Sequence, residues 1–242
     1  MWERTIDGRV LSFRLAGINN QNFIMQDRET GSWWQQVSGE AIQGPLKGRH
    51  LARVFHDELT FREWMKELPG GRVLQPAADS AWRSFSAGWE EETARLPVRV
   101  HRTVDPALPP RTLIAGVDIG GIAKAYPLDR IAAQAPLHDR LGGTPIVLFI
   151  GPDGKSVRVF ESRLGSLQLE FIRPAEGEPG MVVDVETGSR WSFRGQAVSG
   201  ALAGKQLTPV YVLLDYWFDW KTYHMESGVY LLGSQGAREP GS

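Results

Sequence analysis

The sequence contains no cysteine among its 242 residues. Disulfides, iron–sulfur clusters, cysteine-bearing zinc sites and thiol nucleophiles are therefore excluded. Basic and acidic residues nearly balance, with 27 Lys and Arg against 28 Asp and Glu. This near-zero net charge provides neither the basic field that attracts nucleic acid nor a polybasic membrane signal. We expect no nucleic-acid partner.

The sequence also lacks long apolar runs. No stretch of 18 uninterrupted apolar residues occurs, so we expect no membrane-spanning helix and no membrane partner. The segment from Met1 to Asp7 lacks the basic and then apolar regions of a cleaved signal peptide. These features predict a cytoplasmic protein. An extracytoplasmic location stays open if the N-terminus is truncated, because Met1 leads directly into what reads as the middle of a β-hairpin.

Catalytic motifs are missing as well. The sequence has no His-Glu-x-x-His, Gly-x-Ser-x-Gly or Gly-x-Gly-x-x-Gly motif. The stretch from Gly200 to Lys205 is one residue short of a phosphate-binding loop, and a structural turn is the better interpretation. None of the five histidines lies four residues from another. We therefore expect no metal and no cofactor, and the missing motifs argue against an enzyme.

The most informative feature that is present is an internal repeat. Residues 27–51 and 184–207 share matched residues at the same irregular spacing, apart from one residue missing in the second stretch. The matched positions in the first stretch are Asp27, Glu29, Thr30, Gly31, Ser32, Trp34, Gly39, Ala41, Gly44, Leu46, Gly48 and Leu51. Matched glycines at irregular spacing do not follow from composition, so the pattern predicts two copies of one structural unit.

Each copy predicts a β-hairpin followed by a helix. Asp-x-Glu-Thr-Gly-Ser suits a turn, because Asp bonds the backbone two residues on and Gly supplies a positive φ. In the first copy, Thr60 and Glu63 form a capping-box pattern. The helix after them carries one apolar face, made of Phe61, Trp64, Met65 and Leu68. In the second copy, Asp215 is the expected cap, and Trp217 and Trp220 lie on the matching face.

These patterns predict an α+β, predominantly β fold with two related units of hairpins and short twisted strands, each with one Trp-bearing helix. Residues 1–76 form the first unit, which lacks the N-terminal half of the second. Residues 77–96 form a linker, residues 97–235 the complete but degenerate second unit, and residues 236–242 a flexible tail. Trp82, Phe85 and Trp89 of the linker have helical spacing. They pack on the two units or, in the sharper hypothesis, dock a protein partner.

The strongest candidate for a ligand site lies in the first unit. Aromatic faces next to planar amides and charged groups suit a small polar ligand. The predicted ligand-binding residues are Asn20, Asn22, Arg28, Trp34, Gln36 and Glu40. A structural role for Trp34 competes with this hypothesis, because Trp191 repeats it. Arg28 and Gln36 have no counterpart in the second unit, where Val185 and Phe193 replace them. These two residues are therefore the best candidates.

An enzyme that uses carboxylates and histidine is the alternative. Glu40, His138 and Asp139 are its weak catalytic candidates. Carboxylates serve as acid and base only where their environments push their pKa values apart. His138 and Asp139 are neighbours on a predicted strand, so their side chains are expected to point to opposite faces.

The motifs resemble a bacterial and archaeal family, the domain of unknown function 3179 (DUF3179). The first unit matches its pattern Asp-Arg-x-Thr-x-Ser-x-Trp-x-Gln from Asp27 to Gln36, followed by Gly39-Glu40-Ala41. The second unit matches its upstream half in Ala123-Lys124-Ala125-Tyr126-Pro127 and in Leu141-Gly142-Gly143-Thr144-Pro145. The resemblance supports the two-unit interpretation and implies no biochemical activity.

The chain departs from this family at one important place. Its members usually carry a Cys-Pro-x-Cys-like motif, whereas the corresponding stretch here, Phe149-Ile150-Gly151-Pro152-Asp153, has no cysteine. Family chemistry that needs thiols is therefore absent. A third hypothesis follows from the resemblance: the chain is a cysteine-free partner subunit of a metal- or redox-related family.

Overall fold

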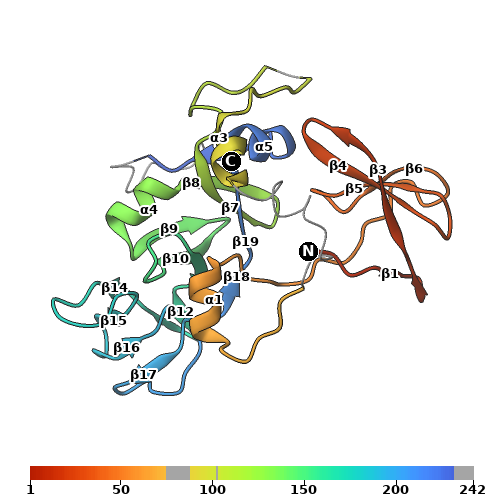
Figure 1. Cartoon of the computed structure of the whole chain (residues 1–242). Helices are drawn as coiled ribbons and strands as arrows, with labels where there is room; N and C mark the ends of the chain where they lie inside the picture. The colour runs from red at the N-terminus through yellow and green to blue at the C-terminus, as the bar shows by residue number, and fades with distance from the viewer. Residues whose placement is uncertain (75–87, 102, 232–242) are drawn as a thin grey trace.

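The computed structural model describes residues 1–74, 88–101 and 103–231 (Figure 1). Short antiparallel sheets dominate, and the helices of the described part are short. The predicted α+β, predominantly β class is confirmed. The two helices that follow the matched segments are α1 (Phe61–Glu67) and α5 (Trp217–Tyr223).

Two packed sheets form the centre of the molecule. One has the order β19 (Val212–Tyr216), β7 (Leu113–Ile119), β8 (Ile122–Pro127) and β20 (Gly228–Val229). The other has the order β18 (Pro209–Val210), β11 (Val157–Glu161), β10 (Thr144–Ile150) and β9 (Leu137–Leu141). Helix α4 (Leu128–Gln134) connects β8 to β9. Apolar side chains from both sheets and α4 make one buried cluster between them.

The β7–β8 hairpin forms at the predicted Gly-Gly pair. Gly120 and Gly121 have φ angles of +63° and +85°. A two-residue turn whose twist matches the flanking strands requires positive φ at both positions, which glycine adopts without strain. This turn fixes the register, in which Gly116 on β7 pairs with Ala125 on β8.

The two matched segments form two further four-stranded sheets of the same order. The first consists of β3 (Phe13–Asn19), β4 (Asn22–Asp27), β5 (Trp33–Gln35) and β6 (Ala41–Gln43). The second consists of β14 (Phe171–Ile172), β15 (Val182–Asp184), β16 (Arg190–Trp191) and β17 (Ala197–Ser199). Each has a register shift at its third strand. In Figure 1 the β3–β6 sheet lies apart from the β14–β17 sheet, on the other side of the central sheets.

The same buried polar cluster holds each sheet together. The Trp34 indole donates to Asp27 Oδ2 over 2.7 Å, and the Trp191 indole donates to Asp184 Oδ2 over 2.8 Å. Both rings are fully buried. The other oxygen of Asp27 accepts from the backbone N–H of Thr30, and the other oxygen of Asp184 accepts from that of Thr187. Burial opposes ionisation of Asp27, but the hydrogen bonds from Trp34 and Thr30 outweigh it and lower its pKa.

The equivalence of the two segments begins upstream of the matched sequence. The hairpin of β1 (Thr5–Ile6) and β2 (Arg9–Val10) precedes β3, and the hairpin of β12 (Arg163–Leu164) and β13 (Leu167–Gln168) precedes β14. Both are closed by a 2.8 Å backbone bond, from Leu11 N to Arg4 O and from Leu169 N to Ser162 O. Sequence comparison alone did not reveal this part, because the hairpins share few side chains.

Helix α1 begins where the sequence predicts but buries a different face. Thr60 is its N-cap, and its hydroxyl accepts from Glu63 N over 3.3 Å. The predicted apolar face is not buried, since Phe61, Met65 and Leu68 are each at least half exposed. The buried residue of α1 is Glu63. The apolar face of α1 therefore does not pack into the buried core of the described residues.

Two further helix predictions have different outcomes. Asp215 is not the cap of α5, because Tyr216 holds that position and Asp215 accepts a bond from the Tyr216 backbone. Trp217 and Trp220 are both buried. In the linker, α3 (Trp89–Arg95) begins at Trp89, which is 49% exposed. Trp82 and Phe85 lie outside the described residues.

We expect Thr60→Ala to lower the free energy of unfolding by about 1 kcal/mol, the usual cost of losing an N-cap hydroxyl. Thr60→Ser keeps the hydroxyl and is expected to behave like the wild type. Urea denaturation of both variants, followed by far-UV circular dichroism, measures the difference. A loss of equal size in both variants would show that the threonine methyl group, and not the cap, is responsible.

Candidate binding cleft

The predicted ligand residues Asn20 and Asn22 contact other parts of the chain. Asn20 lies in the β3–β4 turn, where it and Gln21 adopt positive φ angles, and Asn22 directly follows the turn. Asn20 Oδ1 accepts from His101 N over 2.9 Å, and the Asn22 amide donates to Asp219 of α5 over 2.5 Å. Figure 1 shows the tip of this hairpin beside α5. These two amides therefore attach the β3–β6 sheet to the rest of the molecule.

The other predicted ligand residues do not converge on one place. Trp34 is fully buried and Arg28 is exposed. Gln36 is also exposed, and its backbone oxygen accepts from the Trp2 indole over 2.6 Å. Glu40 is paired with His50, with 3.9 Å between their side-chain atoms.

The weak catalytic candidates each have their own partners. His138 Nε2 lies 3.0 Å from the Phe171 backbone nitrogen. Asp139 accepts from Lys124 over 2.7 Å and from the Tyr126 hydroxyl over 2.8 Å. Their bonds thus lead to different strands, as alternation along β9 requires. Among the described residues, no group of three or more His, Asp or Glu side chains is placed to hold a metal ion.

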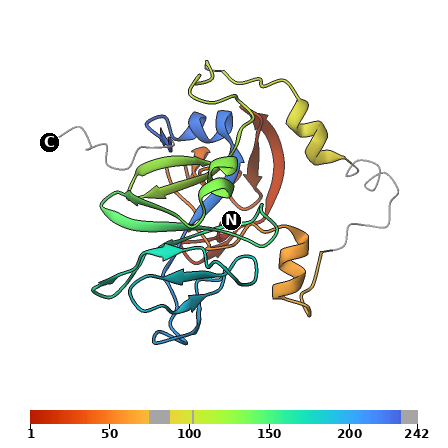
Figure 2. The same ribbon diagram turned by 90° about the vertical axis from the view of Figure 1, so that its left-hand side faces the viewer.

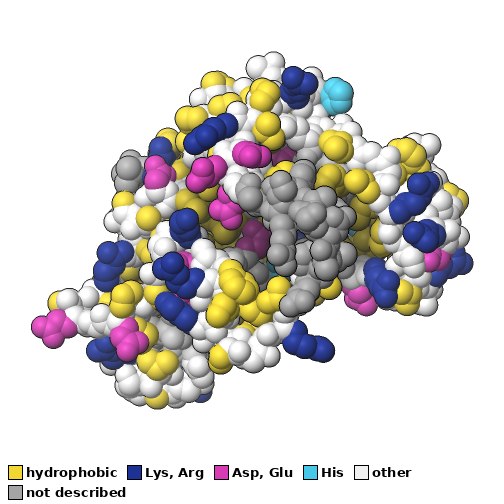
Figure 3. Space-filling view, in the orientation of Figure 1, with side chains coloured by type: hydrophobic (Ala, Val, Ile, Leu, Met, Phe, Trp, Pro, Cys, Tyr) yellow, Lys and Arg dark blue, Asp and Glu magenta, His cyan; other side chains and the backbone are white. Residues whose placement is uncertain are grey.

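A cleft lies between α1 and the edge of the central sheet at β11 and β18. Its volume is about 840 Å³, within the range of sites that bind small molecules. Hydrophobic side chains gather over this region in Figure 3, with Lys and Arg side chains beside them. Its apolar walls are formed by Phe55, Leu59, Phe61, Trp64, Leu68 and Val73 on one side and by Val159, Phe160, Pro209, Val210 and Val212 on the other.

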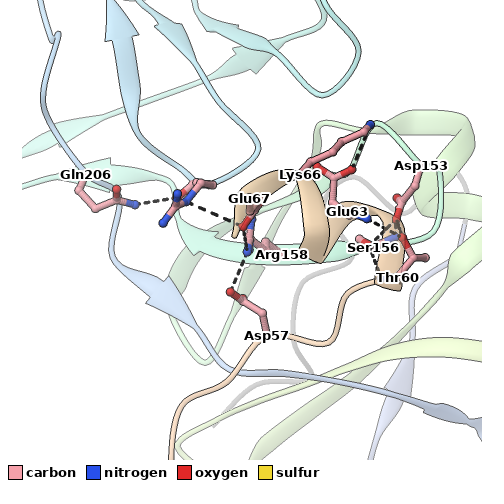
Figure 4. A network of polar contacts seen from close by, with 10 residues as sticks. Asp57, Thr60, Glu63, Lys66, Glu67, Asp153, Ser156, Arg158 and Gln206 are labelled. Atoms are coloured by element: carbon pink, nitrogen blue, oxygen red, sulfur yellow. Dashed lines mark hydrogen bonds and ion pairs between the residues drawn. The ribbon is translucent and has the colours of Figure 1, made fainter. Parts of the chain in front are cut away.

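A buried arginine forms part of the cleft lining. Arg158 is 7% exposed and donates to both carboxylate oxygens of Glu67, over 2.6 and 2.9 Å. A further bond of 2.7 Å reaches Asp57 (Figure 4). The guanidinium also lies 4.7 Å from the centre of the Phe193 ring. Burial opposes the charge of Arg158, but the bonds to Glu67 and Asp57 outweigh it and raise its pKa. Arg158 thereby fixes α1 on β11 from inside the cleft.

A second polar network anchors the start of α1. The Thr60 hydroxyl donates to Asp153 Oδ2 over 2.5 Å, and the Thr60 backbone N–H donates to the Ser156 hydroxyl over 3.0 Å (Figure 4). Ser156 therefore satisfies the N–H that Glu63 would take in a full capping box. Burial opposes ionisation of Asp153, but the bonds from Ser156 and Thr60 outweigh it and lower its pKa to about 2. The turn that contains Asp153 thus holds the start of α1.

Two carboxylates of perturbed pKa lie where the β3–β4 turn contacts α5, at the bond between Asn22 and Asp219. Burial and the neighbouring Asp219 raise the pKa of Asp215 to about 8, and burial raises that of Asp219 to about 6. Each carboxyl group acts on the pKa of the other: Asp219 raises that of Asp215, and Asp215 lowers that of Asp219. The hydroxyl of Tyr223 is buried near Asn20, Asn22 and Asp219, without a well-formed hydrogen bond among the described residues.

The model of a family described as a protein of unknown function, DUF3179, matches residues 1–227. The chain belongs to the DUF3179 family. The match includes the β3–β6 and β14–β17 sheets, the central sheets apart from β20, and α5, so the cleft and the Asp215–Asp219 pair lie within the DUF3179 region. No curated protein and no solved structure matches the chain. No helix among the described residues has the length and apolar character needed to span a bilayer.

Sequence reasoning missed the residues that line and support the cleft. Arg158 lies 91 residues from Glu67 and 101 from Asp57 along the chain, so no local pattern connects them. The local signal is the apolar helical face of Phe61, Trp64 and Leu68, which indicates an apolar surface but not what lies against it.

Proposed function

We propose that this DUF3179 protein is a non-catalytic binding or assembly module whose ligand or partner occupies the α1 cleft. The observation that carries this proposal is an apolar cleft of about 840 Å³ whose helical wall is half exposed. Arg158 and Glu67 hold this wall in place without any contribution from a ligand. Such a preformed apolar concavity with a few fixed polar groups is the usual form of a binding site.

The two-unit organisation supports a binding role. We infer that residues 1–76 and 97–235 are two copies of one unit, with residues 77–96 as linker. The equivalent sheets, hairpins and terminal helices support this inference. In the second copy the Trp-bearing helix is covered, whereas in the first it lines the cleft. Duplication thus leaves one helix face available for a new contact.

A small polar ligand bound to the first unit through Arg28 and Gln36 is the second candidate location. It is favoured by the exposure of both side chains, which the second unit replaces with Val185 and the buried Phe193. The two side chains have no common partner in the described structure, which is why we rank the cleft first.

A thermal-shift screen tests both locations. The panel contains aryl carboxylates, sugars and amino acids, each at millimolar concentration. We expect aryl carboxylates to raise the melting temperature, because the cleft combines apolar walls with Arg72 and Arg194. Phe61→Glu is expected to abolish the shift, and the double variant Arg28→Ala with Gln36→Ala to preserve it. The opposite pattern would place the site in the first unit, and no shift with any compound would count against a small-molecule ligand.

A further inference from the structure

Helices α1 and α5 are equivalent in position and geometry. Their limits, Phe61–Glu67 and Trp217–Tyr223, are seven residues long in both cases. Both end with the same backbone bond of 2.9 Å, from Leu68 N to Trp64 O and from His224 N to Trp220 O. The terminal residues Leu68 and His224 also share φ near −130° and ψ of 68°. Trp64 therefore occupies in α1 the place that Trp220 occupies in α5.

The last residue of each helix reaches a strand of the other unit. Glu67 of α1 binds Arg158 of β11, while Tyr223, its counterpart in α5, lies near Asn22 of β4. Between the helices, Glu58 accepts a bond of 3.1 Å from Leu214 N. The two helices therefore make equivalent contacts on this side, and their Trp-bearing sides can be compared directly.

A β-hairpin covers the Trp-bearing side of α5. Trp217 and Trp220 pack against Ile114 of β7 and Ala125 of β8, and both rings are buried. Gly116 makes room for the second ring, because a Cβ atom at this position would lie 2.3 Å from Trp220. A glycine in a strand often marks such a close approach. The β7–β8 hairpin is thus shaped to receive a helical tryptophan.

Nothing of this kind covers α1 in the described part of the chain. Phe61 is 60% exposed and Leu68 is 51% exposed. The rings of Phe61 and Trp64 stack on each other with 5.6 Å between centres, and Gly71 approaches the Trp64 ring closely. None of the four buried clusters formed by the described residues includes an α1 side chain. The β7–β8 hairpin of this chain is itself enclosed, with α5 on one face and the central core on the other.

We propose that the α1 cleft docks a β-hairpin of a partner protein, one shaped like β7–β8 with a glycine placed opposite Trp64. This inference rests on the proposed binding function and names its partner. A second copy of this chain is disfavoured as the occupant, because its own hairpin is covered on both faces. Arg62, Lys66, Arg72 and Arg194 form an exposed basic rim around the helix face. The hairpin is therefore expected to carry acidic side chains at its edges, where they face this rim.

The test uses a head-to-tail cyclised peptide with the sequence of residues 112–127 and Lys124 replaced by Glu, because cyclisation favours the hairpin. Its binding to the full-length protein is measured by isothermal titration calorimetry. We expect saturable binding that Phe61→Glu weakens at least tenfold. Leu15→Glu is the matched control, since Leu15 on β3 is also 60% exposed, and it should leave affinity unchanged. A peptide with Gly116→Trp should fail to bind, because its side chain meets Trp64.

The proposal is overturned if the peptide does not bind, or if Phe61→Glu does not weaken its binding. If the peptide binds only after Trp82→Ala and Phe85→Ala, the occupant is the chain's own segment. If sedimentation shows self-association that Phe61→Glu abolishes, the occupant is a second copy. A small-molecule shift lost in Phe61→Glu, together with a peptide that does not bind, would refute the hairpin and leave the proposed cleft standing.

Discussion

Trp191→Ala is expected to lower the free energy of unfolding by about 3–5 kcal/mol, the usual cost of removing a large ring from a packed core. Trp191 is fully buried, and its ring contacts Phe171 edge to face with 5.7 Å between centres. The substitution also removes the indole that donates to Asp184. The expected loss therefore combines a cavity with a buried carboxylate that lacks one of its donors.

Urea denaturation at pH 7, followed by far-UV circular dichroism, measures this effect. Trp34→Ala is the matched variant, because Trp34 is equally buried and bonded to Asp27. Trp89→Ala is the control on exposed surface and is expected to cost less than 1 kcal/mol. Trp191→Phe should fall between, since it keeps an aromatic ring but loses the hydrogen bond. A cost below about 2 kcal/mol for Trp191→Ala would mean that the β14–β17 sheet collapses around the cavity.

The Asp–Trp clusters were largely predictable because they are local. Asp27 and Trp34 are seven residues apart, and a turn rich in Gly, Ser and Thr brings them to adjacent strands. Their repetition at Asp184 and Trp191 favoured a structural role, although Trp34 was also a predicted ligand residue. The hairpin turns were predictable for the same reason, since Gly120 and Gly121 determine a local conformation with little dependence on distant residues.

The surroundings of α1 were not predictable from its own sequence. Apolar spacing shows that one side of a helix is hydrophobic, but it does not show what lies against that side. Here the long-range bonds of Thr60 and Glu67 orient the helix, so that Glu63 is buried and Phe61 is left exposed. These bonds depend on a fold that brings distant strands together.

The polar residues of the β3–β4 turn show a second reason why a binding site cannot be predicted from sequence alone. Sequence reasoning selected Asn20 and Asn22 as hydrogen-bonding groups with a purpose, and both make specific bonds. Their partners are the backbone of His101 and the carboxylate of Asp219, far along the chain. An amide suited to a ligand is equally suited to a contact within the protein, and only the fold distinguishes the two.

The contact made by Asn22 leads to a prediction about pH. Asp219 accepts from Asn22, and burial together with Asp219 raises the pKa of Asp215, so Asp215 keeps its proton to a higher pH than in the unfolded chain. In the folded protein the pKa of Asp215 is raised from 3.8 to about 8. The folded state therefore binds more protons than the unfolded state between these values, and the free energy of unfolding falls as pH rises. This stabilisation is complete below about pH 4 and is lost by about pH 8.

We expect Asp215→Asn to remove this pH dependence and to stabilise the protein at pH 8 by on the order of 2 kcal/mol, because its neutral amide can donate to Asp219 at every pH. At pH 4 the variant should match the wild type. Asp153→Asn is the control of opposite sign, since the folded pKa of Asp153 is lowered to about 2. Its stabilisation exists above about pH 4 and is lost as pH falls toward 2. Urea denaturation between pH 3 and pH 9 resolves both slopes. If the free energy of unfolding depends on pH in the same way in Asp215→Asn and in the wild type, Asp215 does not keep its proton above its usual pKa.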